Sequence, residues 1–145
     1  LDIKLAYRYN DVRADYQSGE LQKPLIAAHR TFANVGYESK SGWKFDYTVN
    51  RIGSKRLAST SKNPENLKRL KKSPAFFLSN AQISKVWNDK FEIYIGGENI
   101  FNYRQENPIT SADDTSSPFF DASQVWGPIF GANIYVGFRH KLFNE

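Results

Sequence analysis

The chain has 145 residues, which suits one domain of ordinary size, and its formal net charge is +5. It contains no Cys, which excludes disulfides and thiolate metal sites. No run of about eighteen apolar residues occurs, so the sequence predicts no transmembrane helix.

Six segments alternate apolar and polar residues with a period of two, which predicts strands with one apolar and one polar face. The longest are about 11–13 residues, whereas strands of soluble domains average about 5–6. A strand tilted by about 45° needs roughly 9–11 residues to cross a bilayer. The lengths therefore favour a membrane β-barrel over a soluble sandwich. The predicted strands are 1–9, 26–38, 43–53, 75–87, 91–101 and 132–143.

The connections between these strands alternate in length. Those at 10–25, 54–74 and 102–131 are long, and those at 39–42 and 88–90 are short. In an up-and-down sheet, alternate connections lie at opposite ends, so all the long loops are predicted at one end. Outer-membrane barrels have this asymmetry, with short periplasmic turns and longer extracellular loops. Aromatic residues beside the short turns fit the girdle at a membrane interface, namely Trp43, Trp87 and Phe91.

The expected fold class is therefore all-β, an antiparallel up-and-down transmembrane β-barrel. Six strands are too few to enclose a lumen, because bacterial barrels begin at about eight. Leu1 already lies within a strand pattern. We expect residues 1–145 to be the C-terminal part of a single larger barrel domain.

One stretch near the end of the chain resembles a known signature. Gly96-Gly97-Glu98-Asn99-Ile100-Phe101-Asn102 is similar to the G-x-x-N-L-F-(D/N) motif of TonB-dependent outer-membrane receptors. The segments 107–109, 125–129 and 134–143 also resemble the last loop and closing strand of that family. The resemblance covers the whole chain as the last six strands of such a barrel.

The resemblance implies a barrel of about 22 strands whose lumen is occluded by an N-terminal plug domain outside this sequence. It implies uptake powered by the TonB complex acting through the plug, and location in the bacterial outer membrane among lipid and lipopolysaccharide. Members usually end on an aromatic residue read by the barrel-assembly machinery. Here Asn144 and Glu145 follow Phe143, so we expect that signal within 138–143.

The alternation predicts which side chains face the lumen, where they contact a plug or tune an open pore. These residues are Lys4, Arg8, Lys44, Asp46, Asn80, Gln82, Glu92 and Glu98.

The loops supply other candidates. In the last loop, aromatic and basic residues are candidate ligand contacts, although packing of the loop onto itself is the favoured interpretation of the aromatics. They are Tyr103, Arg104, Phe119, Phe120 and Trp126.

The positive charge is concentrated in one loop. Residues 54–73 hold seven Lys or Arg and one Glu, a net +6, which leaves −1 for the rest of the chain. Asn63 followed by Pro64 predicts the start of a short helix there, with Leu67 and Leu70 on one side. The charge predicts attraction of an anionic ligand or of lipopolysaccharide phosphates, unless the loop is only solvated. The candidate contacts are Lys68, Arg69, Lys71 and Lys72.

Other classes of function have little support. The basic loop contains no aromatic residue, so the stacking surface of a nucleic-acid-binding groove is missing. No nucleophile motif, phosphate loop or His pair is present, so no catalytic residue or cofactor is predicted. Asp113, Asp114 and Asp121 lack calcium-loop spacing, and turn formation is the favoured interpretation over a metal site.

The resemblance thus implies TonB-dependent uptake of a scarce ligand such as a siderophore, cobalamin or another metal complex. Two alternatives stay open. One is a passive porin, with an open lumen and no plug. The other is a soluble antiparallel β-domain that binds a ligand, whose apolar strand faces would need a second layer to cover them.

Overall fold

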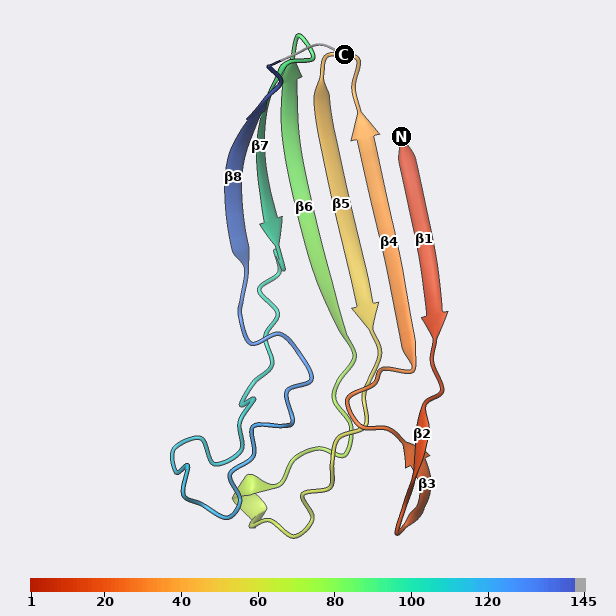
Figure 1. The fold of residues 1–145 in the computed structure, drawn as a ribbon, viewed down its shortest axis with the longest axis vertical. Helices are drawn as coiled ribbons and strands as arrows, with labels where there is room; N and C mark the ends of the chain where they lie inside the picture. Colours follow the sequence, from red (N-terminus) through yellow and green to blue (C-terminus); the bar gives the residue numbers. More distant parts are fainter. Residues whose placement is uncertain (143–145) are drawn as a thin grey trace.

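The computed structural model describes residues 1–142, and six long strands form one antiparallel sheet. Their spatial order is β1-β4-β5-β6-β7-β8, so each strand pairs with its neighbour in this series (Figure 1). The six predicted strands are confirmed, with ends shifted by a few residues. Their bounds are β1 Asp2–Tyr9, β4 His29–Glu38, β5 Trp43–Ile52, β6 Phe76–Trp87, β7 Phe91–Glu98 and β8 Asn133–His140. The predicted strand end at Phe143, and with it part of the assembly signal, lies outside the described residues.

The sheet is open, with β1 and β8 as its two edges, so these six strands do not close into a barrel. Both short turns lie at one end of the sheet, and the three long loops lie together at the other end (Figure 1). The predicted asymmetry of the connections is confirmed. No helix within residues 1–142 has the length and hydropathy needed to span a bilayer.

The two short turns have local causes. Asn88 and Asp89 adopt φ values of +51° and +55°, the left-handed pair that a tight hairpin requires, and Asn and Asp tolerate it best after Gly. In the other turn Gly42 has φ +82°, and a Cβ there would lie 2.4 Å from the Val86 carbonyl oxygen. Gly42 is therefore required by both its conformation and its close neighbour.

Two loop elements differ from prediction. The segment predicted as irregular at 10–25 contains a hairpin of β2 (Arg13–Tyr16) and β3 (Gly19–Gln22), closed by Gly19 at φ +99°. The predicted short helix exists only as one 3₁₀ turn, η1 (Glu65–Leu67). Its N-cap is Pro64 rather than Asn63, with no side-chain cap, and Leu70 lies beyond it, so the predicted cap and two-leucine face are wrong.

The strand register aligns apolar side chains into continuous rows across one surface, called here the apolar face. One row crosses the last five strands of the sheet order, from β4 to β8: Tyr37, Phe45, Ile83, Ile95 and Val136. This face is uncovered, since Leu5, Ile95 and Phe138 are 76%, 53% and 72% exposed. The buried apolar residues lie instead at the long-loop end: Ala27, Leu57 and Phe76.

Candidate functional site

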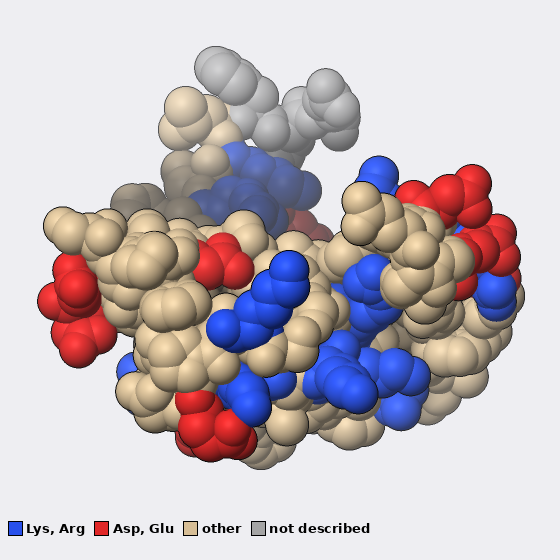
Figure 2. Space-filling view, turned by 90° about the horizontal axis from the view of Figure 1, so that it is seen from below, with Lys and Arg blue, Asp and Glu red and all other residues tan. Residues whose placement is uncertain are grey.

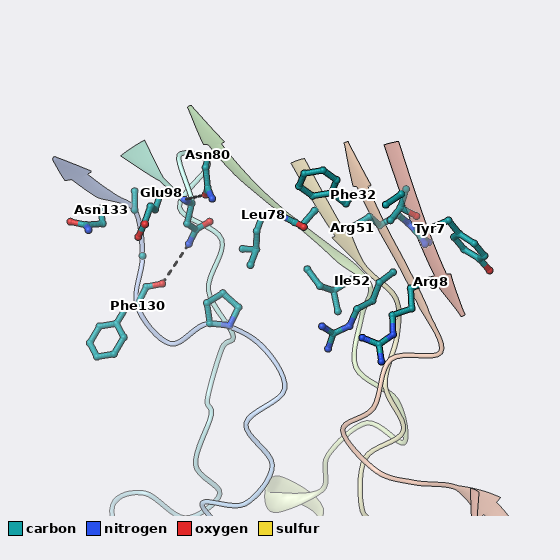
Figure 3. A pocket seen from close by; sticks show the side chains of 18 residues that line it. Tyr7, Arg8, Phe32, Arg51, Ile52, Leu78, Asn80, Glu98, Phe130 and Asn133 are labelled. Atoms are coloured by element: carbon teal, nitrogen blue, oxygen red, sulfur yellow. Dashed lines mark hydrogen bonds between the residues drawn. The ribbon is translucent and has the colours of Figure 1, made fainter. Parts of the chain in front are cut away.

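The opposite surface, the polar face, is hollowed where it meets the long loops. This hollow has a volume of about 1000 Å³, and strands β1, β4, β5 and β6 form much of its wall (Figure 3). The loop after β7 and the segment leading into β8 complete it. Its lining mixes charged, amide and apolar side chains, among them Arg8, Arg30, Phe32, Asn50, Ile52, Leu78, Asn80, Glu98 and Asn133.

Two arginines form the positive wall of the hollow. Arg8 and Arg30 are direct cross-strand partners of β1 and β4, and like charges at such a position repel each other. Arg8 donates to the Asn10 side chain at 2.9 Å. The charge of Arg30, after the larger effect of burial, lowers the pKa of Lys55. Among the described residues neither arginine has an ion pair, so this wall presents unneutralised positive charge.

The other wall is organised by Asn99, the residue of the signature motif at which β7 gives way to the last loop. Its φ of +48° turns the chain, which explains why Asn serves better there than a bulkier residue. Its side-chain amide donates to the Tyr103 carbonyl at 2.7 Å and accepts from the Tyr103 N–H at 3.0 Å. The Asn99 backbone N–H donates to Asn80 at 3.0 Å (Figure 3). Asn99 therefore fixes the chain where it leaves β7, beside Glu98, at the wall of the hollow.

A second hollow of about 500 Å³ lies on the polar face near the short turns. Buried Asn34 donates to Asp46 and Thr48, each at 2.9 Å, which keeps the polar side chains there bonded to one another. Arg139 pairs with Glu92 at 2.9 Å. The two hollows lie at opposite ends of the same face.

The predicted lumen-facing residues divide between these places. Arg8, Asn80 and Glu98 line the hollow beside the loops. The hollow near the short turns takes Lys44, Asp46, Gln82 and Glu92. Lys4 lines neither and pairs with Asp2 at 2.9 Å. All eight share the polar face in the strand register, and their function stays a prediction.

The predicted ligand contacts of the last loop do not form one cluster. Tyr103 stacks on buried Phe76 with ring centroids 4.9 Å apart, and Trp126 lies 5.8 Å from the same ring. Burial, with a smaller effect of the Glu106 charge, raises the pKa of Tyr103. These two aromatics pack the loop, the interpretation favoured from the sequence. Phe119 and Phe120 lie elsewhere in the loop and Arg104 is exposed, and ligand contact by all five stays a prediction.

Gln105 is a structural residue of this loop that the sequence did not single out. Its buried side chain accepts from the Trp126 and Gly127 N–H groups at 2.7 and 2.9 Å and donates to the Gln124 carbonyl at 3.1 Å. The Gln105 side chain therefore supplies backbone groups of residues 124–127, about twenty residues away, with the hydrogen bonds that a neighbouring strand would otherwise provide. A single Gln in a loop carries no pattern that would have revealed this contact.

The basic loop lies at the same end of the molecule. Figure 2 shows Lys and Arg gathered across the middle of this end, with Asp and Glu toward its margins. The candidate anion contacts differ in their surroundings. Lys68 pairs with Glu65, and the Arg69 guanidinium donates to Thr110 at 3.0 Å and to the Ile109 carbonyl at 2.9 Å. Lys71 and Lys72 are exposed. Arg69 thus joins two long loops.

The acidic residues of the last loop form turns. Asp114 accepts from the Ser116 N–H at 3.0 Å, and Asp121 accepts from the Ser123 N–H at 2.7 Å. The hydrogen bonding to Ser123 is the largest cause that lowers the pKa of Asp121. Within residues 1–142 no group of three or more His, Cys, Asp or Glu side chains is placed to hold a metal ion.

Comparison with known proteins found no matching family model, curated protein or solved structure. The features that bear on function are therefore the two faces of the sheet, its loops and its hollows.

Proposed function

We propose that this chain is part of the wall of an outer-membrane β-barrel of the TonB-dependent transporter type, which takes up a scarce ligand across the bacterial outer membrane. The observation that carries the proposal is the uncovered apolar face. Exposed Leu, Ile, Val and aromatic side chains run from β1 to β8 across this face. Soluble monomers rarely expose an apolar patch of more than a few hundred Å².

Lipid contact gives this face a partner that the described chain does not supply. Burying one such side chain is worth about 1.5–3 kcal/mol, so a water-exposed sheet with these rows would carry a large cost. A soluble β-domain would need a second layer over the face. In a bilayer the acyl chains take that place, and the polar face turns toward the lumen.

The short-turn end has the features expected at a membrane interface. Lys85 is a charged residue on the apolar face, yet it lies at its margin, with its ammonium 5.3 Å from the Trp43 ring centroid and 5.9 Å from that of Trp87. It donates to the Ser41 carbonyl in the turn. A long cationic side chain that reaches past aromatic rings toward a turn is typical of interfacial residues.

In this proposal the wall and loops bind and gate, and no residue performs chemistry. The polar-face hollow with Arg8, Asn80 and Glu98 faces the plug domain and the bound ligand. The TonB complex acts on the plug, the basic loop faces lipopolysaccharide, and the closing strand engages the barrel-assembly machinery. The remaining strands of the barrel pair with the open edges of β1 and β8.

Conductance in planar lipid bilayers tests this function against the porin alternative. The full-length protein should insert and remain electrically silent, because a plug occludes its lumen. A steady open channel would contradict the transporter and favour the passive porin. Failure to enter the bilayer, with full solubility in the absence of detergent, would contradict both and favour the soluble domain.

A further inference from the structure

A pocket separate from the polar-face hollow lies between the β2–β3 hairpin and the second long loop. Its volume is about 650 Å³, and none of its lining residues lines the hollow. Four cationic side chains line it, and no Asp or Glu does: Arg56, Lys68, Arg69 and Lys71. We call it the basic pocket. A concave site lined by cationic side chains and by no carboxylate attracts anions.

Two of the four cations already have partners. Lys68 pairs with Glu65, and the Arg69 guanidinium is bonded to Thr110 and Ile109. Lys71 is exposed and forms no ion pair among the described residues. The basic pocket therefore retains at least one cation that is free to meet a ligand.

Arg56 is the second such cation. Its guanidinium lies 4.8 Å from the centroid of the Tyr16 ring, which fixes the group from one side. Its Nε–H is buried and has no acceptor among the described residues, and it forms no ion pair there. Buried charged donors are normally hydrogen-bonded, so this group is an exception that requires an explanation.

The rest of the lining combines hydroxyl groups with apolar side chains. Ser59 and Ser61 bond to each other at 3.1 Å at one part of the rim. Leu21 from the hairpin and Leu57 and Leu70 from the loop supply apolar surface. Leu70 is 70% exposed, so its side chain is open to contact by an apolar group. The pocket thus offers cations, hydroxyl donors and apolar contact together.

We propose that the basic pocket binds a phosphate monoester carried on an apolar body. A phosphate monoester has a charge of about −1.5 to −2 at neutral pH and three acceptor oxygens, which suits two unneutralised cations with hydroxyl donors nearby. The planar fork of Arg matches phosphate geometry. The apolar body covers Leu70 and its neighbours. The site is built by loops alone and does not depend on uptake of a ligand, but its test in nanodiscs rests on the membrane location in the proposed function.

Isothermal titration calorimetry of the full-length protein in nanodiscs tests this site, with empty nanodiscs as the blank. Dihexanoyl phosphatidic acid is the probe, and glycerol 3-phosphate supplies the same phosphate without the apolar body. The expected result is saturable binding of the first with an affinity at least about tenfold higher than that of the second. R56Q and K71Q should each weaken it at least about tenfold, the loss expected for one charge-assisted bond.

K62Q is the matched control, because Lys62 is an exposed cation of the same loop that does not line the pocket. It should leave the affinity unchanged. Equal weakening by K62Q and K71Q would overturn the proposal, since it would indicate diffuse attraction to the loop. Equal affinity for glycerol 3-phosphate would overturn the apolar part and indicate a soluble phosphate source. If R56Q does not fold, K71Q at its exposed position still decides the outcome.

Discussion

The pairing of β7 with β8 depends on two tyrosines that lie over glycines of the neighbouring strand. Tyr94 is the direct partner of Gly137, and Tyr135 is the direct partner of Gly96. A Cβ added at Gly96 would lie 2.4 Å from the Tyr135 ring, about 1 Å too close, and one at Gly137 would meet Tyr94 at the same distance. Gly96→Ala therefore forces the Tyr135 ring away from its position.

The expected loss is about 2–4 kcal/mol in the free energy of unfolding. Overpacking of this kind costs about 1–3 kcal/mol, and displacement of Tyr135 also strains its 3.0 Å bond to Gln82, worth about 1 kcal/mol. Urea unfolding of the reconstituted full-length protein, followed by tryptophan fluorescence, measures the change. Gly97→Ala is the control. Its Cβ would lie 2.9 Å from the flexible Ile100 side chain and at an ordinary 3.5 Å from the Asn133 carbonyl oxygen, so it should cost less than about 1 kcal/mol.

A double-mutant cycle isolates the contact. In a Tyr135→Ala background the ring is gone, so Gly96→Ala should become nearly neutral. Equal costs for Gly96→Ala and Gly97→Ala, or an undiminished cost of Gly96→Ala without the Tyr135 ring, would refute the reasoning.

Three further outcomes follow from single contacts. Asn99→Ala removes two hydrogen bonds to Tyr103 from a residue at positive φ. It should lower the free energy of unfolding by about 2–3 kcal/mol, and Asn99→Asp should lower it by an intermediate amount. Equal stability of Asn99→Ala and the native chain would contradict the role given to this amide. Because the folded pKa of Asp121 is below its ordinary value of 3.8, its stabilising effect is complete above that pH and is lost as the pH falls through the folded pKa. An NMR titration of the Ser123 amide should have its midpoint below 3.8 and vanish in Asp121→Asn, and a midpoint at or above 3.8 would be inconsistent with the bond. Lys85→Gln removes the cation beside Trp43 and Trp87 and should change their fluorescence and cost about 1 kcal/mol, whereas an unchanged spectrum would argue against that contact.

The long strands could be predicted because the geometry of a strand requires a regular alternation of residue types in its sequence. Side chains alternate across a sheet, so Phe91, Ile93 and Ile95 identify one face without any knowledge of their partners. The tight turns at Gly42 and Asn88-Asp89 then fix which residues pair across each hairpin. Register and faces follow from these local features.

The loops could not be predicted in the same way, because their contacts join residues far apart in sequence. Arg69 was a candidate for an anionic ligand from its charge alone, yet its guanidinium bonds to Thr110 and Ile109 about forty residues away. The β2–β3 hairpin was hidden because Arg13, Asp15 and Glu20 made the segment look like a solvated loop. The ion pair of Arg13 with Glu20 at 3.3 Å shows how such charges instead accompany strand pairing.

The central claim is that the apolar face contacts lipid and the polar face does not, and spin-label accessibility along β7 tests it most directly. Residues 1–145 contain no Cys, so a Cys introduced at Glu92, Ile93, Tyr94 or Ile95 is the single labelling position within them when the full-length protein is studied in liposomes. Labels at Ile93 and Ile95 should be accessible to oxygen, which concentrates in the bilayer, and shielded from a water-soluble nickel complex. Labels at Glu92 and Tyr94 should lack this high oxygen accessibility. High nickel accessibility at Ile93 and Ile95 would contradict the membrane account. So would low accessibility of both labels to oxygen as well as to nickel, because a protein layer would then cover them.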